Sequence, residues 1–281
     1  MLKDYVKTAP QFLLPKKTLT QWVGLLANIK TPGIKNRLIR LFIEKYNVDM
    51  SEAQKEDPED FVNFNEFFIR YLKPELRPLA KAKVVSPVDG ALSEFGLINE
   101  GQIIQAKGHY YTVNELLAGE EQLSQHFMRG SFATFYLSPK DYHRIHMPMD
   151  ALLTKMVYVP GKLFSVQPAT VRIIPQLFAR NERLVAFFDT AQGFMAMVLV
   201  GATIVGAIGT RWQGEMKRSR GKQSFDFTEK DIHAQQGEEM GYFKLGSTVV
   251  LLFSEKQHWH QALQVGSPVR YGQALSDVLL D

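Results

Sequence analysis

Residues 190–210 carry no charged side chain, and the segment is long enough to cross a membrane as a helix. Glycine and β-branched residues dominate it, however, and the glycines are Gly193, Gly201, Gly206 and Gly209. Glycine disfavours helices and marks turns, whereas β-branched residues favour strands. We therefore expect strands here rather than a membrane helix, with a hairpin whose arms are residues 184–188 and 194–200.

The rest of the chain fits an α+β fold. With 281 residues and 45% hydrophobic content, it can bury a large core. We expect helices over residues 1–75 and a mostly antiparallel β body over residues 76–281, with short connecting helices such as 113–119. Residues 248–253 are predicted to form another buried strand, and the proline-rich stretch 73–78 is predicted to be the hinge between the two regions.

The amino-terminal region has the pattern of two amphipathic helices separated at Pro32-Gly33. The apolar stripe is Leu19, Trp22, Val23, Leu26 and Ile29 in the first helix and Ile34, Leu38, Leu41 and Phe42 in the second. Residues 1–50 contain six more basic than acidic residues, whereas the whole chain carries +4. Since Lys35, Arg37 and Arg40 accompany the second stripe, we expect 1–75 to be a membrane-associating region. The alternative from pattern alone is a helical hairpin docked on the body.

Several classes of protein are disfavoured. The first fifteen residues lack the apolar segment of a secretory signal, and Asp4 stands where such a signal is basic, so we expect no targeting peptide. The chain has no cysteine, which excludes disulfides and thiolate metal sites and suits a reducing cytoplasm. His143-x-x-His146 and His258-x-His260 have no evident third and fourth ligands, so we expect no metal. No nucleic-acid motif is present.

A glycine followed by a hydroxyl residue precedes the last apolar strand, at Gly246-Ser247-Thr248. Glycine can adopt a strained backbone that exposes a peptide bond, and Ser247 supplies an oxygen nucleophile one residue away. A chain can cut itself at a site of this kind, although the same residues occur in many ordinary turns. On this short segment alone, the ordinary beginning of a strand is the alternative.

Two further segments supply the partners that a serine nucleophile requires. Residues 86–90 read Ser-Pro-Val-Asp-Gly and contain Asp89, and residues 142–148 read Tyr-His-Arg-Ile-His-Met-Pro and contain His143 and His146. An aspartate, a histidine and a serine in any chain order can form a charge-relay triad. Taken singly, Asp89 could be a turn acceptor, and the histidines could be ordinary core or surface residues.

Together these segments resemble the phosphatidylserine decarboxylases that carry a pyruvoyl group, in their short bacterial form. The resemblance runs over nearly the whole chain, in the expected order. The motifs that carry it are residues 86–90 and 142–148, Leu245-Gly-Ser-Thr248, residues 61–72 (Phe-Val-Asn-Phe-Asn-Glu-Phe-Phe-Ile-Arg-Tyr-Leu) and residues 177–183 (Leu-Phe-Ala-Arg-Asn-Glu-Arg).

The resemblance implies a zymogen that matures by autocatalytic cleavage. Ser247, with His146 as base and Asp89 behind it, would attack the carbonyl of Gly246, and elimination would leave a pyruvoyl group derived from Ser247 as the covalent cofactor. The resulting lyase of phospholipid biosynthesis would decarboxylate phosphatidylserine to phosphatidylethanolamine through a Schiff base. The general acid would be His143. Residues three apart share a face on a helix but not on a strand, so joint action of both histidines requires a turn or helical twist around Arg144.

The same resemblance implies a large chain of residues 1–246 and a small chain of residues 247–281 that stay associated and share sheets. It also implies a homodimer that lies peripherally on the cytoplasmic face of a bacterial membrane, where its lipid substrate is found. Two rivals from other classes remain. A conventional serine hydrolase would keep the Ser247 hydroxyl, although Gly-Ser-Thr is not the usual nucleophile elbow. A non-catalytic lipid-surface binder would leave the Gly246–Ser247 bond intact.

Overall fold

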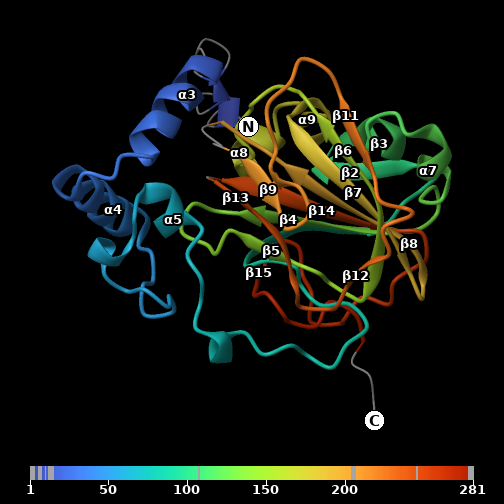
Figure 1. Ribbon diagram of the computed structural model, residues 1–281. Helices are drawn as coiled ribbons and strands as arrows, with labels where there is room; N and C mark the ends of the chain where they lie inside the picture. The colour runs from blue at the N-terminus through green and yellow to red at the C-terminus, as the bar shows by residue number, and fades with distance from the viewer. Residues whose placement is uncertain are drawn as a thin grey trace.

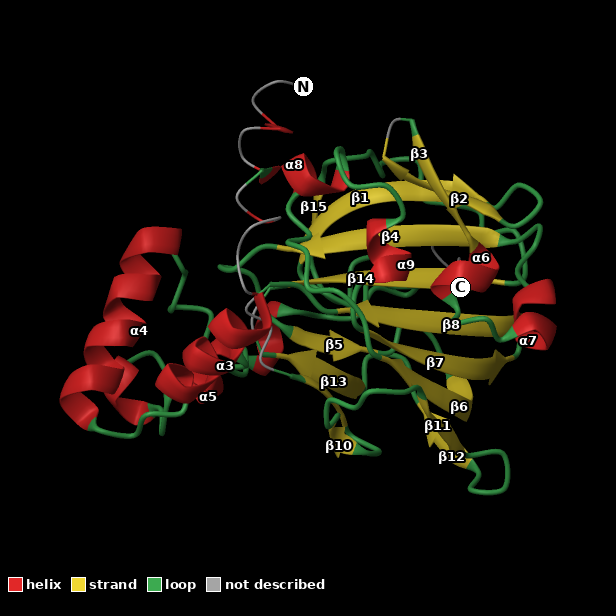
Figure 2. Cartoon of the chain, turned by 90° about the horizontal axis from the view of Figure 1, so that it is seen from above, coloured by secondary structure: helices red, strands yellow, loops and turns green. Residues whose placement is uncertain are grey.

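The computed structural model describes residues 4, 5, 8, 9, 11, 16–106, 108–203, 207–244 and 246–277. It confirms the α+β class, with the longer helices near the amino terminus and antiparallel sheets in the rest of the chain. Figures 1 and 2 show helices α3, α4 and α5 together on one side of the β body. No helix among the described residues has the length and apolar character needed to cross a membrane.

From residue 16 onward, two longer helices and three short ones precede the body. They are α3 (Lys16–Ala27), α4 (Pro32–Tyr46), η1 (Pro58–Asp60), α5 (Phe64–Phe68) and η2 (Pro74–Leu76). The predicted break at Pro32-Gly33 is wrong by a few residues: the helices are separated by residues 28–31, and Pro32 begins α4. Proline is favoured in this place because the first helical N–H has no partner to lose.

The buried face of α4 also differs from the predicted stripe. Ile39 is fully buried among phenylalanines of residues 61–68, whereas Ile34 and Leu41 are each 53% exposed. Lys35 is buried and donates from Nζ to the backbone oxygens of Pro58, Glu59 and Phe61. Lys35 was counted among the basic residues of the membrane-associating region, but it does not lie on the surface, because its ammonium group binds the loop at residues 58–61.

A nine-stranded antiparallel sheet forms the centre of the body, in the order β11-β6-β7-β8-β14-β4-β1-β15, with β12 also paired to β6. Its strands are β1 (Gly90–Leu97), β4 (Ser131–Leu137), β6 (Ala151–Val159), β7 (Arg183–Thr190), β8 (Gly193–Val200), β11 (Gln223–Asp226), β12 (Ile232–Ala234), β14 (Ser247–Phe253) and β15 (Pro268–Val269). Both strand predictions are confirmed: β7 and β8 pair as a hairpin, and β14 is buried along its whole length.

Smaller elements cover the two faces of this sheet. A four-stranded sheet consists of β10 (Gly214–Glu215), β9 (Ile208–Thr210), β13 (Glu239–Phe243) and β5 (Arg144–His146), and a separate hairpin consists of β2 (Gln102–Ala106) and β3 (His109–Thr112). The short helices are α6 (Val113–Leu116), α7 (Glu121–Gln125), α8 (Pro168–Val171) and α9 (Leu177–Arg180). Helix α6 confirms the connecting helix predicted at 113–119, in a shorter form.

The apolar side chains of β14 divide between two cores, one on each face of the large sheet. Val249 and Leu251 belong to a cluster that also contains residues of β5, β9 and β13, so the four-stranded sheet packs on this face. Val250 and Leu252 belong to a second cluster with residues of α6, α8 and α9 on the opposite face. Strand β14 therefore lies in the middle of the molecule, between β4 and β8.

Candidate active site

Ser247 is the first residue of β14, and its Cα is paired with that of Leu137 in β4. Its side chain is fully buried, and its hydroxyl has no hydrogen-bond partner among the described residues. Because side chains alternate along a strand, Ser247 shares the face of Val249 and Leu251, between the two sheets. The predicted nucleophile is thus a buried hydroxyl that no hydrogen bond from the described residues restrains.

Gly246 precedes it with φ +36°, in the left-handed region that favours glycine. A Cβ built on this residue would meet no atom of the described residues within 4 Å, apart from its chain neighbours, so Gly246 is not crowded by the described part of the chain. Thr248 carries a second buried hydroxyl without a partner among the described residues. Its side chain lies on the opposite face of β14 from Ser247, since strand side chains alternate.

His143 lies immediately before β5 and is fully buried. Its Nδ1 is 2.8 Å from the backbone oxygen of Asp141, so this nitrogen carries the proton and Nε2 is left as an acceptor. Nε2 has no partner among the described residues, and the ring lies 4.2 Å from that of Phe68, centroid to centroid. Burial lowers the pKa of His143 to about 3, which keeps the imidazole neutral at pH 7.

His146 has both ring nitrogens engaged. Nδ1 donates to the backbone oxygen of Gly237 at 2.9 Å, and Nε2 then accepts from the Tyr142 hydroxyl at 3.0 Å. The ring stacks on Tyr271, with centroids 3.7 Å apart. Burial also lowers the pKa of His146, to about 4.

Asp89 lies near His146 but bonds to other groups. The Arg77 guanidinium donates to its carboxylate, with Nη2 2.6 Å from Oδ2, and the backbone N–H of Tyr271 donates to Oδ1 at 2.8 Å. Tyr271 therefore connects Asp89 to His146, through its N–H on one side and its ring on the other. Glu52 binds the same Arg77, with its Oε2 2.6 Å from Nη2.

The structure brings Asp89 and His146 into one cluster, yet no hydrogen bond among the described residues joins Ser247 to either histidine. Residues 144–146 form a strand, so the helical twist around Arg144 that joint action would require is not present. Ile145 belongs to the core between the sheets. By alternation, His143 shares that interior side with Ser247, whereas His146 faces the other side of β5.

Three residues of the site were not singled out in the sequence. Arg77 lies in the stretch 73–78, which was interpreted as a hinge because of its prolines, and the charge of Arg77 was not considered. Tyr142 begins a motif in which only the histidines have an obvious chemical role. Tyr271 lies far along the chain from Asp89 and His146, and no spacing rule connects it to them.

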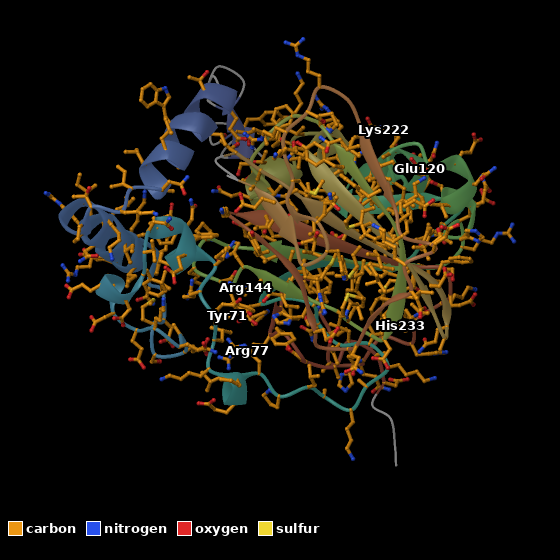
Figure 3. All side chains as sticks on the ribbon, in the orientation of Figure 1. Tyr71, Arg77, Glu120, Arg144, Lys222 and His233 are labelled. Carbon is orange, nitrogen blue, oxygen red and sulfur yellow. The ribbon has the colours of Figure 1, made fainter. Side chains whose placement is uncertain are left out.

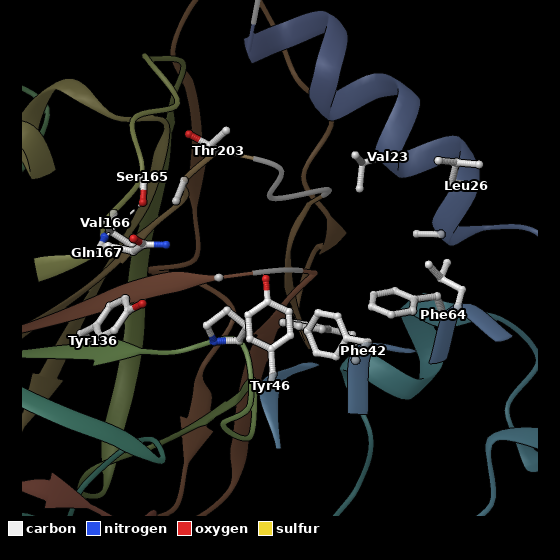
Figure 4. A pocket seen from close by; sticks show the side chains of 16 residues that line it. Val23, Leu26, Phe42, Tyr46, Phe64, Tyr136, Ser165, Val166, Gln167 and Thr203 are labelled. Atoms are coloured by element: carbon white, nitrogen blue, oxygen red, sulfur yellow. Dashed lines mark hydrogen bonds between the residues drawn. The ribbon is translucent and has the colours of Figure 1, made fainter. Parts of the chain in front are cut away.

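An apolar cavity of about 340 Å³ separates α3, α4 and α5 from the body and reaches Gly246. Figure 4 shows Val23, Leu26, Phe42 and Phe64 on the helical side, and the polar side chains of Ser165, Gln167 and Thr203 on the body side. Tyr136 also lines it, one residue before the partner of Ser247. Among the described residues, no cluster of three or more histidine, aspartate or glutamate side chains is arranged to hold a metal.

The neutral buried histidines predict a specific acid sensitivity. In uncut Ser247→Ala protein, the free energy of unfolding should fall as the pH drops from about 6.5 toward about 4. Over this range histidines of the unfolded chain take up protons at their ordinary pKa of 6.5, whereas His143 and His146 in the folded chain do not. Urea unfolding at pH 7 and pH 5 measures the difference.

His143→Asn is the control, since the asparagine amide can keep the donor to the Asp141 oxygen but does not titrate. Between pH 7 and pH 5, the Ser247→Ala protein with His143→Asn should lose less free energy of unfolding than the Ser247→Ala protein that keeps His143. Equal losses would show that His143 does not resist protonation in the folded chain.

Comparison with known proteins matches this sequence to one family. The profile described as phosphatidylserine decarboxylase matches residues 64–277, and a second profile, PSD, matches residues 6–47. The phosphatidylserine decarboxylase proenzyme of Legionella pneumophila (strain Lens) is 58% identical over 280 residues, which cover 98% of this chain and 99% of that protein. The proenzyme of Polaromonas naphthalenivorans (strain CJ2) is 49% identical over 286 residues, covering 100% and 99%. That of Azoarcus sp. (strain BH72) is 52% identical over 256 residues, covering 90% and 89%.

Proposed function

The chain belongs to the phosphatidylserine decarboxylase family, and we propose that it is a self-processing lyase that converts phosphatidylserine to phosphatidylethanolamine and carbon dioxide. The observation that carries the proposal is the Gly246–Ser247 junction. A buried serine hydroxyl without a partner among the described residues follows a glycine with φ +36° that those residues do not crowd. A serine kept only for structure would normally bond its buried hydroxyl.

The chain breaks through its own atoms, and water is taken up only when the ketone forms. The Ser247 oxygen attacks the Gly246 carbonyl carbon, the peptide nitrogen leaves, and the amide becomes an ester with a free amine on Ser247. Removal of the Ser247 Cα proton then breaks the Cβ–O bond, so the oxygen departs in the new carboxylate of Gly246. The dehydroalanine left behind tautomerises to an imine, water adds, and ammonia leaves. Residues 1–246 and 247–281 become separate chains, and the second begins with a pyruvoyl group.

The junction fits a pyruvoyl group, because strand pairing fixes the beginning of β14 whereas Gly246, on the other side of the cleaved bond, is not crowded by the described residues. Strand β14 is paired with β4 and β8 along its length, and both of those strands belong to the large chain. These pairings support our proposal that the two chains stay associated after cleavage. When formed, the pyruvoyl group supplies a ketone that condenses with the substrate amine and accepts the electron pair released as carbon dioxide departs.

For the proton transfers, we propose His146 with Asp89 as the base in cleavage, and His143 as the residue that handles the proton of the substrate carbon. The Asp89–Tyr271–His146 cluster supports the first role. The free Nε2 of His143 and its place on the Ser247 side of β5 support a different assignment, in which His143 is the base. Substitution of each histidine distinguishes the two assignments, as argued in the Discussion.

We also propose that the helical region places the enzyme on the cytoplasmic face of the bacterial membrane. Helix α3 exposes Trp22 and Leu25, each 64% exposed, next to the apolar cavity that reaches Gly246. Large apolar side chains gathered on a surface are typical of a docking face. The basic excess of residues 1–50 would add attraction to anionic lipids. A homodimer remains a prediction from the family resemblance.

Trp22→Asp should weaken sedimentation with phosphatidylglycerol vesicles by roughly tenfold or more, because burial of a large apolar side chain contributes about 1.5–3 kcal/mol. Arg37 is exposed, and Arg37→Glu should weaken binding only at low salt, where surface charges are least screened. Val265→Asp is the control, since Val265 is 56% exposed on the body. Wild-type binding by Trp22→Asp would show that the helices have a structural role only.

A further inference from the structure

Arg70 is a buried cation with unused hydrogen-bond donors. Arg70 comes two residues after the end of α5 and is only 5% exposed. Nη2 donates to the backbone oxygen of Lys140 at 2.9 Å, whereas Nε and Nη1 have no partner among the described residues. The guanidinium remains charged in proteins, and a buried charge without partners is costly. A site of this kind is stabilised when an anion binds it.

Arg70 lines a polar cavity of about 510 Å³, together with Asp89, Tyr136 and Tyr142 among others. Tyr136 also lines the apolar cavity that reaches Gly246. The loop that Arg70 binds at Lys140 begins one residue after Leu137, the strand partner of Ser247. The cation is therefore adjacent both to the apolar cavity and to the predicted chemical centre.

The other buried cation of this cavity is Arg77, which is labelled in Figure 3 and binds Asp89 and Glu52. Lys140 and Arg270 also line the cavity, but both are exposed. Asp141 accepts from the backbone N–H of Ser138 at 2.7 Å. No carboxylate among the described residues forms a salt bridge with Arg70. Of the two buried arginines that line this cavity, Arg70 is therefore the one with donors that have no partner among the described residues.

We propose that Arg70 binds the phosphate of the phospholipid substrate. This inference rests on the proposed function and assigns the phosphodiester to the polar cavity and the acyl chains to the apolar one. The substrate carboxylate is the other anion available. A cation on that group would stabilise the ground state, since the carboxylate charge leaves as the bond to carbon dioxide breaks, so it would slow the reaction. A guanidinium fork on a phosphate carries no such penalty.

The test compares two amines that differ by a glycerophosphate group, and the Arg70 variants show how much of the difference is due to the phosphate. Glycerophosphoethanolamine carries an amine and a phosphodiester but no carboxylate, and ethanolamine carries the amine alone. By calorimetry, the processed wild-type enzyme should bind glycerophosphoethanolamine at least about tenfold more tightly than ethanolamine. Arg70→Gln should reduce this ratio to below about threefold, and Arg70→Lys should retain part of it. The extent of self-cleavage reports whether each variant folds, because cleavage does not involve the lipid.

Arg270→Gln is the matched control. Arg270 lines the same cavity, but its side chain is 67% exposed, so the substitution should leave the ratio at its wild-type value. A ratio near one in the wild-type enzyme would overturn the phosphate site. So would an Arg70→Gln variant that keeps the full wild-type ratio. If Arg70→Gln does not fold, the same conclusion would follow from an Arg70→Lys variant that keeps the full ratio. If the wild-type enzyme releases no carbon dioxide from phosphatidylserine, the proposed function itself fails, so the two failures are distinct.

Discussion

Ser247→Ala should remain a single uncut chain and release no carbon dioxide from phosphatidylserine above background, a loss of about 10⁴-fold or more. Alanine has no oxygen to attack the Gly246 carbonyl, and without cleavage the ketone that accepts the electron pair never forms. A denaturing gel and a carbon dioxide assay on the same preparation measure both effects.

Thr248→Val is the control for this substitution. Thr248 also carries a buried hydroxyl without a partner among the described residues, one position further along β14. Valine keeps its shape and removes only the hydroxyl, so the variant should cleave and decarboxylate. Cleavage of Ser247→Ala at the same bond would eliminate Ser247 as the nucleophile.

The second large effect separates the two histidines. His146→Ala should abolish cleavage, because Ser247 loses its proposed base, whereas His143→Ala should cut to some extent and decarboxylate at least about 100-fold more slowly. Time courses of cleavage, followed by decarboxylation assays of whatever is cut, give both rates. If His143→Ala stays uncut and His146→Ala cuts normally, the base is His143, as its free Nε2 and interior position indicate.

Asp89→Asn completes this series and should slow cleavage by about 10²- to 10⁴-fold through loss of the charge behind His146. The substitution also weakens the contact with Arg77, so Glu52→Gln serves as its control. Glu52 is the other carboxylate on Arg77, and within the described part of the chain it forms no hydrogen bond with His146 or Tyr271. Equal slowing in both variants would show that Asp89 acts by holding Arg77 rather than by supporting a histidine.

Local sequence pattern predicted the secondary structure around the cleavage site well. The hairpin of β7 and β8 and the buried strand β14 follow from side-chain chemistry within each segment, because β-branched runs and glycine turns act locally. The helices α3 and α4 were likewise predicted from apolar spacing, although the break between them was placed too late in the chain.

The directions of side chains could not be read in the same way. Which side of β5 carries His143 depends on how that strand packs against the large sheet, and residues distant in sequence determine this packing. Lys35 had the spacing of a membrane-facing cation, yet the loop at residues 58–61 folds back to bind its ammonium group. Arg70 sits in a recognised motif, but only the fold shows that two of its donors are unused.

The mass of the small chain in the active wild-type enzyme tests the central claim most directly. We predict a fragment covering residues 247–281 that is lighter by one ammonia than the peptide of that sequence, and that resists sequencing from its amino end because a ketone replaces the amine. A fragment with an amino-terminal serine would show cleavage without formation of the cofactor. Full activity from an uncut chain would contradict the account altogether.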